Sequence, residues 1–379
     1  MTTPSVSMNG QRPAPVRLGI VGCGSVSQAY LTQAGPMARQ GQVELVAACD
    51  VMPDRARALQ GKFGIRRVAD HYLDIINAAD IDLVLILTSM PEHGPISRAA
   101  LEAGKHVLVE KPMAVSLDEA AELVALARKS PGYLLPAPHV ILSPTYQTIW
   151  KRLQRGDIGP VFSARGLYGW SGPEWGKWFY EPGGGPLFDL GVYNITSLTG
   201  LLGPAKRVMA MTGVAIPERV VDGEPMRVET EDNAQVLIDF GQACFAVVTT
   251  GFIFQQYRRP ALELYGARGT IQMLGDDWEP NGFEMWQNET AAWQVFNETA
   301  PNWPWTDGLR HLVEAIQQGT RPIITPEHGF HVLEIMLKAQ ESGRTGRAVD
   351  IESRFTPADF VGQVEMRPEH RIHDRSRAE

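Results

Sequence analysis

The chain has 379 residues, with 35 basic and 43 acidic side chains and a formal net charge of -8. Its length suffices for two hydrophobic cores of ordinary size. The absence of a basic surplus argues against nucleic acid as the main partner. The first 15 residues lack the apolar core of a signal peptide, and no apolar run has the length of a membrane helix. We therefore expect a cytoplasmic protein without membrane contact and with a disordered tail at residues 1–15.

The organising motif of the N-terminal half is a strand, a glycine-rich turn, a helix and a second strand at residues 16–50. The turn has the sequence GCGSVS at residues 22–27, and the second strand ends at Asp50. In a dinucleotide site Gly22 permits the tight turn, and Gly24 lets a pyrophosphate approach the backbone. The helix N-terminus attracts the phosphates, and the acidic residue accepts hydrogen bonds from the adenosine ribose. The residues expected to bind the dinucleotide here are Gly22, Cys23, Gly24, Ser25, Val26 and Asp50.

The acidic strand end also bears on the choice of dinucleotide. Asp50 is followed by Val51 without an adjacent Arg or Ser cluster, and its charge would repel the 2′-phosphate of NADP. This favours NAD. Arg55 and Arg57 lie a few residues further on and keep NADP open as the alternative. The third small position of the motif is Ser27, which is small enough for close packing of helix on strand.

Strands and helices alternate through the rest of the N-terminal half. Continuous apolar runs at residues 81–88 and 106–109 predict strands that are buried on both faces of a parallel sheet. Residues 91–103 predict the helix between them, and a capped helix follows Ser116. This alternation predicts a doubly wound Rossmann sheet, in which ligands bind at the carboxyl ends of the strands. The further residues expected at this cofactor rim are Thr88, Ser89, His93, Glu110 and Lys111.

The pattern changes in the C-terminal half. Short strands predominate at residues 206–272, and a final helix is expected to begin with Pro326 and to end at Gly343. The run of strands predicts an antiparallel sheet in a second domain of α+β type. The expected division is a Rossmann domain at residues 16–137, a substrate-binding and oligomerisation domain at 138–365, and a polar tail at 366–379.

Two stretches carry residues suited to acid–base chemistry. Lys111 follows a buried strand, where partial burial lowers a lysine pKa and allows proton exchange near neutral pH. The alternative is a surface lysine paired with Glu110. Asp189 and Tyr193 follow three glycines and are four residues apart, so in a helix they share a face and can position a substrate hydroxyl. From these residues alone, an Asp favoured by the helix dipole and a packed Tyr is the preferred explanation.

Aromatic residues gather just before this second stretch. Trp170, Trp175, Trp178 and Tyr180 present flat faces that suit the C–H faces of sugars, although for each of them singly a place in the hydrophobic core is the simpler explanation. The three cysteines give no disulfide framework. No cluster of His, Cys, Asp or Glu has metal-ligand spacing, so no metal is expected.

Taken in this order, the motifs resemble those of the Gfo/Idh/MocA oxidoreductase family, which includes glucose–fructose oxidoreductase and inositol dehydrogenase. The matching segments are Gly22-x-Gly24, Asp50, AGKHVLVEKP at residues 103–112, GGGPLFD at residues 183–189, and Tyr265-Gly266-x-Arg268-Gly269. The resemblance covers nearly the whole chain. It implies an α/β protein with an N-terminal Rossmann domain and a C-terminal domain that has a large, open, mostly antiparallel sheet. The exposed face of that sheet often serves oligomerisation, so a homodimer or homotetramer is expected.

The resemblance also implies roles for single residues. It makes Lys111 the catalytic lysine, and it makes Asp189 the residue that orients the substrate and supports proton transfer. Many members carry a His four residues after this Asp, where this chain has Tyr193. A free Tyr titrates at about 10 and a His at about 6.5, so Tyr193 serves as an acid, as a link to the lysine, or only as a binding group. His139 lies where relatives contact the nicotinamide end, and Trp178 is a further candidate for substrate binding.

We therefore expect an NAD-dependent oxidoreductase that transfers a hydride between the nicotinamide and a secondary alcohol of a sugar, cyclitol or glycoside. In this reading Lys111 is the acid/base, and Asp189 and Tyr193 orient the substrate. One alternative is a glycoside hydrolase that uses tightly bound NAD in a transient oxidation, which the intact Glu-Lys-Pro sequence disfavours. Another is a ligand sensor that binds dinucleotide without turnover.

Overall fold

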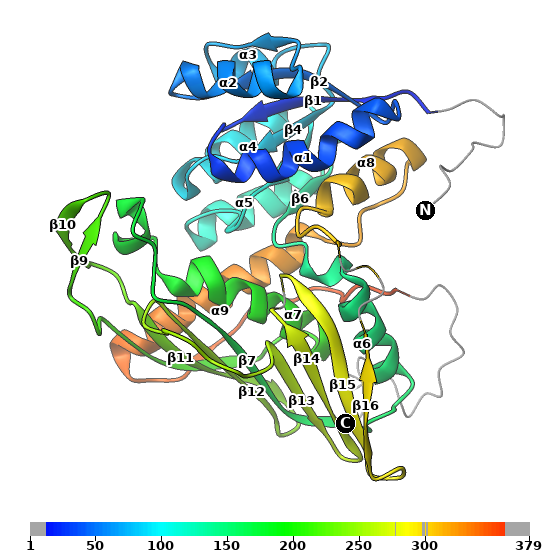
Figure 1. Ribbon diagram of the computed structural model, residues 1–379, viewed down its shortest axis with the longest axis vertical. Coiled ribbons are helices and arrows are strands. Elements are labelled where there is room, and N and C mark those ends of the chain that lie inside the picture. The colour runs from blue at the N-terminus through cyan, green and yellow to red at the C-terminus, as the bar shows by residue number, and fades with distance from the viewer. Residues whose placement is uncertain (1–12, 277, 298–299, 301, 361–379) are drawn as a thin grey trace. The chain divides into compact units, whose positions relative to one another are not determined.

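The computed structural model describes residues 13–276, 278–297, 300 and 302–360 (Figure 1). The polar tail predicted at residues 366–379 and most of the tail predicted at residues 1–15 lie outside the described residues. The chain forms two compact units. Unit 1 comprises the described residues through Ala114, then Asp118–Ala137 and Thr306–Pro326; unit 2 comprises Val115–Leu117, Pro138–Trp305 and the described residues from Glu327 onward.

Unit 1 is built on a parallel sheet, which in the described part of the chain has six strands in the order β3-β2-β1-β4-β5-β6. The four residues of β4 are all fully buried, as the continuous apolar run predicts for a strand covered on both faces. The order reverses between β1 and β4, so the carboxyl ends of these two strands form the crevice where such sheets bind ligands. The strands are β1 Val16–Val21, β2 Val43–Cys49, β3 Arg67–Val68, β4 Leu83–Ile86, β5 His106–Val109 and β6 Leu134–Pro136.

Helices cover this sheet and follow the predicted alternation. The turn after β4 begins as a short 3-10 helix, Met90–Glu92, before the α-helix that was predicted at residues 91–103. One helix comes from far along the chain, because α8 (Gly308–Gln318, orange in Figure 1) packs against α1, β1 and β5. The segment that carries α8 thus groups with unit 1, although the sequence interpretation placed it within residues 138–365. The other helices of this unit are α1 Ser25–Arg39, α2 Pro53–Phe63, α3 Tyr72–Ile76, α4 His93–Glu102 and α5 Leu117–Ala127.

Unit 2 contains an open sheet with nine strands among the described residues, in the order β16-β15-β14-β13-β7-β12-β11-β8-β17. Its neighbouring strands are antiparallel except for β7 and β12, which run parallel. The predicted fold class, a Rossmann sheet followed by a large, mostly antiparallel sheet, is therefore confirmed. The strands are β7 Val161–Gly169, β8 Arg207–Gly213, β11 Asn233–Gly241, β12 Cys244–Gly251, β13 Leu262–Gly266, β14 Gly269–Gly275, β15 Pro280–Gln287, β16 Ala292–Phe296 and β17 Val349–Asp350.

One face of the large sheet is covered by the helices of unit 2 (Figure 1). Exposed and buried residues alternate along β8 and β11, which is the pattern of strands with a single packed face. Helix α9 lies against β8, where the backbone N–H of Ala210 donates to Ser342 Oγ. The helices are α6 Pro144–Gln154, α7 Val192–Leu202 and α9 Pro326–Thr345, with short 3-10 segments at Val140–Leu142 and Lys177–Tyr180.

Two features of unit 2 depart from the sequence interpretation. The last helix continues through Gly343 to Thr345, and Gly346, with φ of 65°, follows its end. Gly343 stays helical because it packs closely on β8, where an added Cβ would lie 2.2 Å from Thr212 Oγ1. A two-stranded hairpin, β9 (Glu218–Val221) and β10 (Glu224–Arg227), was not foreseen.

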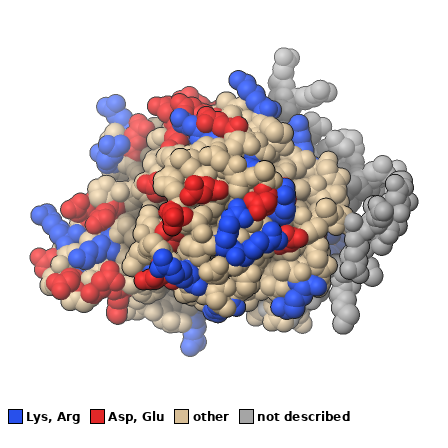
Figure 2. All heavy atoms as spheres, turned by 90° about the horizontal axis from the view of Figure 1, so that it is seen from above, with Lys and Arg blue, Asp and Glu red and all other residues tan. Residues whose placement is uncertain are grey.

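None of the helices in the described part of the chain has the length and apolarity needed to cross a bilayer. On the face drawn in Figure 2, acidic and basic side chains are interspersed among the other residues.

Candidate active site

The turn after β1 needs a glycine for a steric reason. Gly22 has a φ of 93°, and an added Cβ would lie 2.5 Å from both the carbonyl carbon and the carbonyl oxygen of Leu87. Its backbone N–H donates to the carbonyl of Cys49 at 2.9 Å, so the ends of β1 and β2 are held together with the end of β4 alongside. This is the crevice predicted for a dinucleotide.

The start of helix α1 is open on the side that an anion would approach. Gly24 is the N-cap residue and has no side-chain cap, and a Cβ added there would meet nothing within 4 Å. The first turn carries no acidic side chain, so nothing negative competes with a phosphate for its N–H groups. Ser27, the third small position, is buried and donates to the carbonyl of Gly24 at 2.5 Å. These features fit the pyrophosphate of a dinucleotide.

Asp50 lies at the end of β2 with its carboxylate held by two backbone N–H groups. Cys23 donates to one oxygen at 2.7 Å, and Met52 donates to the other at 2.8 Å. Each carboxylate oxygen accepts more than one hydrogen bond, so both retain capacity for ribose hydroxyls. Burial, reinforced by the charge of Asp50, raises the pKa of the Cys23 thiol to about 12. Cys23 therefore contributes its backbone to the site and keeps an inert thiol.

His93 ties together the segments that follow β4 and β5. It is buried, its Nδ1 lies 2.7 Å from the carbonyl oxygen of Pro112, and its Nε2 lies 3.1 Å from that of Thr88. Burial lowers the pKa of His93. A neutral imidazole has one N–H, which donates to one of these two carbonyls. The ring nitrogens thus face protein carbonyls, and the geometry supports a role in positioning this rim.

Glu110 is buried beside Lys111 and is held from two sides. The hydroxyl of Tyr30, on α1, donates to Glu110 Oε1 at 2.8 Å, and the backbone N–H of Lys111 lies 3.1 Å from Oε2. The carboxylate thereby anchors the turn that presents Lys111, whose side chain is partly exposed. Sequence reasoning missed Tyr30, because nothing local marks a partner that lies 80 residues away along the chain.

In unit 2, Asp189 and Tyr193 emerge from an otherwise buried stretch. Between residues 184 and 201 they are the two residues that are not buried. Asp189 lies in a π-helical turn, Leu187–Gly191, that runs directly into α7, and its backbone N–H donates to the carbonyl of Gly185 at 3.1 Å. The four-residue spacing between Asp189 and Tyr193, which was predicted to place them on one helical face, thus includes a π-helical turn. Such turns are frequent at functional sites. The pair presents a carboxyl and a phenol on one partly exposed surface.

Aromatic rings surround Tyr193. The ring centroid of Tyr168, on β7, lies 5.9 Å away in an edge-to-face arrangement, and that of Trp278 lies 6.3 Å away. Trp278 also lies 6.3 Å from Trp305. Sequence reasoning did not identify Tyr168 or Trp278, since they come from strands and loops that only the folded sheet brings together.

The aromatic residues that precede the second stretch, of which Trp178 was the candidate for substrate binding, have mixed surroundings. Tyr180 is fully buried and packs edge-to-face on Phe252 at 5.6 Å, so it belongs to the core. Trp178 stacks on Phe179 at 3.6 Å but is 41% exposed, which leaves its outer face available. His139 is buried at the start of a 3-10 turn, with Nδ1 3.3 Å from the carbonyl oxygen of Trp305.

The structure thus assembles two sets of residues, each within its own unit. The glycine turn, Asp50, His93 and Lys111 belong to unit 1, and Asp189, Tyr193, Trp178 and His139 belong to unit 2. Among the described residues, no group of three or more His, Cys, Asp or Glu side chains is arranged to hold a metal ion.

Models of known protein families match both units. A family model described as "Oxidoreductase family, NAD-binding Rossmann fold" matches residues 16–136, and one described as "GFO/IDH/MocA C-terminal domain" matches residues 146–272. An uncharacterized oxidoreductase of Rhizobium meliloti is 30% identical over 266 residues, which is 68% of this chain and 74% of that protein. D-apiose dehydrogenase of Paraburkholderia graminis is 24% identical over 90% of this chain and 91% of its own. The crystal structure of levoglucosan dehydrogenase with NADH and L-sorbose has the same fold, with a TM-score of 0.81, 20% identity and coverage of 90% of this chain and 100% of the other.

Proposed function

The chain belongs to the Gfo/Idh/MocA oxidoreductase family, and we propose that it is an NAD-dependent oxidoreductase acting on a secondary alcohol of a sugar, cyclitol or glycoside. The observation that carries this proposal is the cofactor turn, in which Gly24 leaves open space at the uncapped start of α1 and Asp50 is fixed at the end of β2. These residues would hold the pyrophosphate and the adenosine ribose of the dinucleotide.

The surroundings of Asp50 favour NAD over NADP. Its carboxylate would accept hydrogen bonds from the ribose hydroxyls, and its negative charge would repel a 2′-phosphate. Arg57 forms an ion pair with Asp54, in which Nη1 lies 2.7 Å from Oδ1. Arg55 is exposed on the same helix and is the residue through which NADP would bind if the preference were reversed.

The bound nicotinamide supplies the hydride acceptor or donor, and the chain supplies the proton transfer and the orientation of the substrate. Lys111 Nζ takes the hydroxyl proton in oxidation and returns it in reduction. Glu110, fixed by Tyr30, holds the turn on which this lysine stands. Asp189 and Tyr193 bind neighbouring hydroxyls, since they are the partly exposed polar groups of an otherwise buried segment. The phenol of Tyr193 orients the hydroxyl.

The substrate class is supported by the relatives. D-apiose dehydrogenase, levoglucosan dehydrogenase and the D-glucoside 3-dehydrogenase of Escherichia coli, which is 31% identical over half of this chain, are named for reactions on sugars. Others are named as trans-1,2-dihydrobenzene-1,2-diol dehydrogenases, as in Bos taurus at 24% identity over 86% of this chain. All of these substrates carry a secondary alcohol on a ring or chain with further hydroxyls, which matches a site with two polar side chains beside aromatic rings.

The exposed face of the large sheet supports a homodimer. Its strands carry exposed apolar side chains, among which Met211 is 79% exposed. A contiguous apolar face of this kind marks an association surface. The others on these strands are Phe162, Met209, Leu237 and Phe245. Light scattering after gel filtration is expected to give the mass of a dimer or of a dimer of dimers, and Met211→Glu is expected to lower it.

The decisive experiment follows NADH absorbance while the protein is mixed with NAD or NADP and a panel of sugars, inositols and glycosides. Reduction of NAD with one ring class supports the proposal. Lys111→Ala is expected to retain dinucleotide binding and to lose turnover by about 10²–10⁴-fold. Lys129→Ala, a change at an exposed lysine of unit 1, is the matched control and keeps turnover. Near wild-type turnover in Lys111→Ala would contradict the assigned role.

Two other outcomes of the same experiment point to the alternatives. NAD that survives dialysis, together with glycoside cleavage and no net NADH, identifies a hydrolase with a transient oxidation. Dinucleotide binding without turnover of any member of the panel identifies a sensor.

A further inference from the structure

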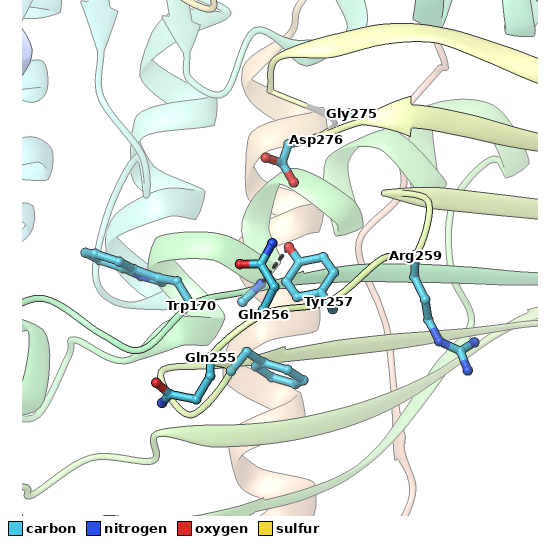
Figure 3. A pocket seen from close by; sticks show the side chains of 9 residues that line it. Trp170, Gln255, Gln256, Tyr257, Arg259, Gly275 and Asp276 are labelled. Carbon is cyan, nitrogen blue, oxygen red and sulfur yellow. Dashed lines mark hydrogen bonds between the residues drawn. The ribbon is translucent and has the colours of Figure 1, made fainter.

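Unit 2 has a pocket of about 360 Å³ where the chain leaves the end of β7 (Figure 3). It is lined by Trp170, by the loop that follows β12, including Phe254, Gln256 and Tyr257, and by Asp276 after β14. Its volume is at the lower end of the range for small-molecule sites, so it suits a single ring. Asp189, Tyr193 and Trp178 do not line it.

The pocket is held open by the packing of its own loop. Phe254 lies against Gly169, where an added Cβ would be 2.3 Å from the Phe254 ring. The Phe254 backbone N–H donates to the carbonyl of Trp170, and the N–H of Gly169 donates to the hydroxyl of Tyr257 at 3.3 Å. The rings of Phe254 and Tyr257 meet edge to face at 6.1 Å. The loop is therefore fixed on the strand end, and a ligand meets a preformed surface.

The lining combines a flat aromatic surface with convergent polar groups. Figure 3 shows the amide of Gln256, the hydroxyl of Tyr257 and the carboxyl of Asp276 turned toward one another, whereas Arg259 points away. Trp170 is braced by Trp175, with ring centroids 5.6 Å apart. An aromatic face with amide, hydroxyl and carboxyl groups suits a ligand that is rich in hydroxyls.

The surroundings of the Asp276 carboxyl suit an uncharged ligand. Burial, together with the charge of the nearby Glu279, raises the pKa of Asp276 above its ordinary value. The carboxyl thus combines readily with hydroxyl groups, which both donate and accept hydrogen bonds.

The pocket adjoins the surface that carries Tyr193. The Tyr193 ring lies against Tyr168 and Trp278, at 5.9 Å and 6.3 Å. Tyr168 is the chain neighbour of Gly169, which lines the pocket, and Trp278 is two residues beyond Asp276. The pocket and the proposed catalytic surface therefore share the end of β7 and the loop after β14.

We propose that this pocket is a second sugar subsite, so that the substrate is a glycoside or disaccharide whose second ring lies between Trp170, Gln256, Tyr257 and Asp276. The inference rests on the proposed function, because it assigns the reacting ring to the surface of Asp189 and Tyr193. A free monosaccharide fills only that surface and leaves the pocket to water. The enzyme then distinguishes between substrates by their second ring, through contacts that lie away from the reacting carbon.

The test is calorimetric titration of the NADH-loaded protein with glucose, galactose and the disaccharides maltose, cellobiose and lactose. At least one disaccharide is expected to bind tenfold or more tightly than its constituent monosaccharides. Gln256→Ala and Asp276→Asn are each expected to reduce the ratio of disaccharide to monosaccharide affinity toward one. Gln255→Ala is the matched control, because this neighbouring amide points away from the polar group (Figure 3).

The two proposals fail in different ways. Equal affinity for disaccharides and monosaccharides, or an unchanged ratio in both variants, overturns the second subsite. Absence of NADH formation, with preferential disaccharide binding that Gln256→Ala abolishes, contradicts the oxidoreductase function on these sugars and leaves the second subsite supported.

Discussion

Acidification from pH 7 to pH 5 is expected to destabilise unit 2, because two neutral histidines on helix α9 are buried. His331 accepts a hydrogen bond from the backbone N–H of Ala205 at Nε2, at 2.9 Å, and its Nδ1 lies 2.7 Å from Ser353 Oγ. Protonation of His331 at Nε2 would place the new ring N–H directly opposite the backbone N–H of Ala205. His328 lies 2.8 Å from Thr199 Oγ1. His331 cannot take up a proton at Nε2 in the folded state without losing the hydrogen bond from Ala205, and for His328 the cost of the charged form comes from its burial.

The magnitude follows from the pKa values. Burial, together with the proximity of His331, lowers the pKa of His328 to about 3, and burial lowers that of His331 to about 4. Because both pKa values are lowered by folding, their contribution is complete above the ordinary value of 6.5 and is lost as the pH falls. At pH 5, roughly 1.5 units below that value, each histidine costs about 2 kcal/mol. The pair therefore removes about 4 kcal/mol, a large part of the free energy of unfolding of an ordinary domain.

The assay is urea unfolding at pH 7 and pH 5, followed by tryptophan fluorescence. His331→Phe is expected to lower the free energy of unfolding at pH 7 by about 1–3 kcal/mol, since it removes the acceptor of the Ala205 N–H. Between pH 7 and pH 5, this variant is expected to lose about 2 kcal/mol less of its free energy of unfolding than the wild type does. Thr199→Val retains both histidines and serves as the control for a lost hydrogen bond. The reasoning is refuted if the wild type and His331→Phe lose the same free energy between the two pH values.

Three further predictions concern the cofactor turn and the core of unit 2. Gly22→Ala is expected to lower the free energy of unfolding of unit 1 by about 1–3 kcal/mol in thermal or urea unfolding, because the backbone φ is positive and the new Cβ would collide with the Leu87 backbone. Gly24→Ala, where a Cβ meets no neighbouring atom, is expected to leave stability unchanged and to weaken NAD binding measured by fluorescence titration. Asp50→Ser is expected to raise the Kd for NAD about tenfold while improving the relative affinity for NADP; an unchanged ratio would contradict the role of this carboxylate. Arg219→Met leaves the fully buried carboxylate of Asp232 without its ion-pair partner, 3.2 Å away, and is expected to cost about 3–5 kcal/mol in urea unfolding.

Periodicity and local motifs were enough to predict the Rossmann sheet. Buried parallel strands read as continuous apolar runs, and the turn at residues 22–27 has few conformations open to it, so both are encoded within short segments. The same holds for the strand ends that carry Asp50 and Lys111, because the carboxyl ends of parallel strands always lie at one edge.

Contacts between distant segments could not be predicted from the sequence. Helix α8 follows every described strand of the large sheet except β17 in the chain, yet it packs on β1 and β5 of unit 1. Its amphipathic pattern shows that it has a buried face but not which sheet covers that face. The hydrogen bond from Tyr30 to Glu110 is of the same kind, since it joins an ordinary helix position to the residue that follows β5.

The sequence by itself determined the fold class and the elements of a nicotinamide dinucleotide site, because backbone conformation and strand burial are local properties of residues such as Gly22 and the runs that flank it. Only the tertiary structure decided which side chains surround the proposed substrate surface. Tyr168 lies on β7, whereas Asp276 and Trp278 lie in the loop after β14, and the two segments meet because β7 and β14 belong to one sheet. Side-chain convergence depends on strand order and register, which no single segment of the sequence encodes.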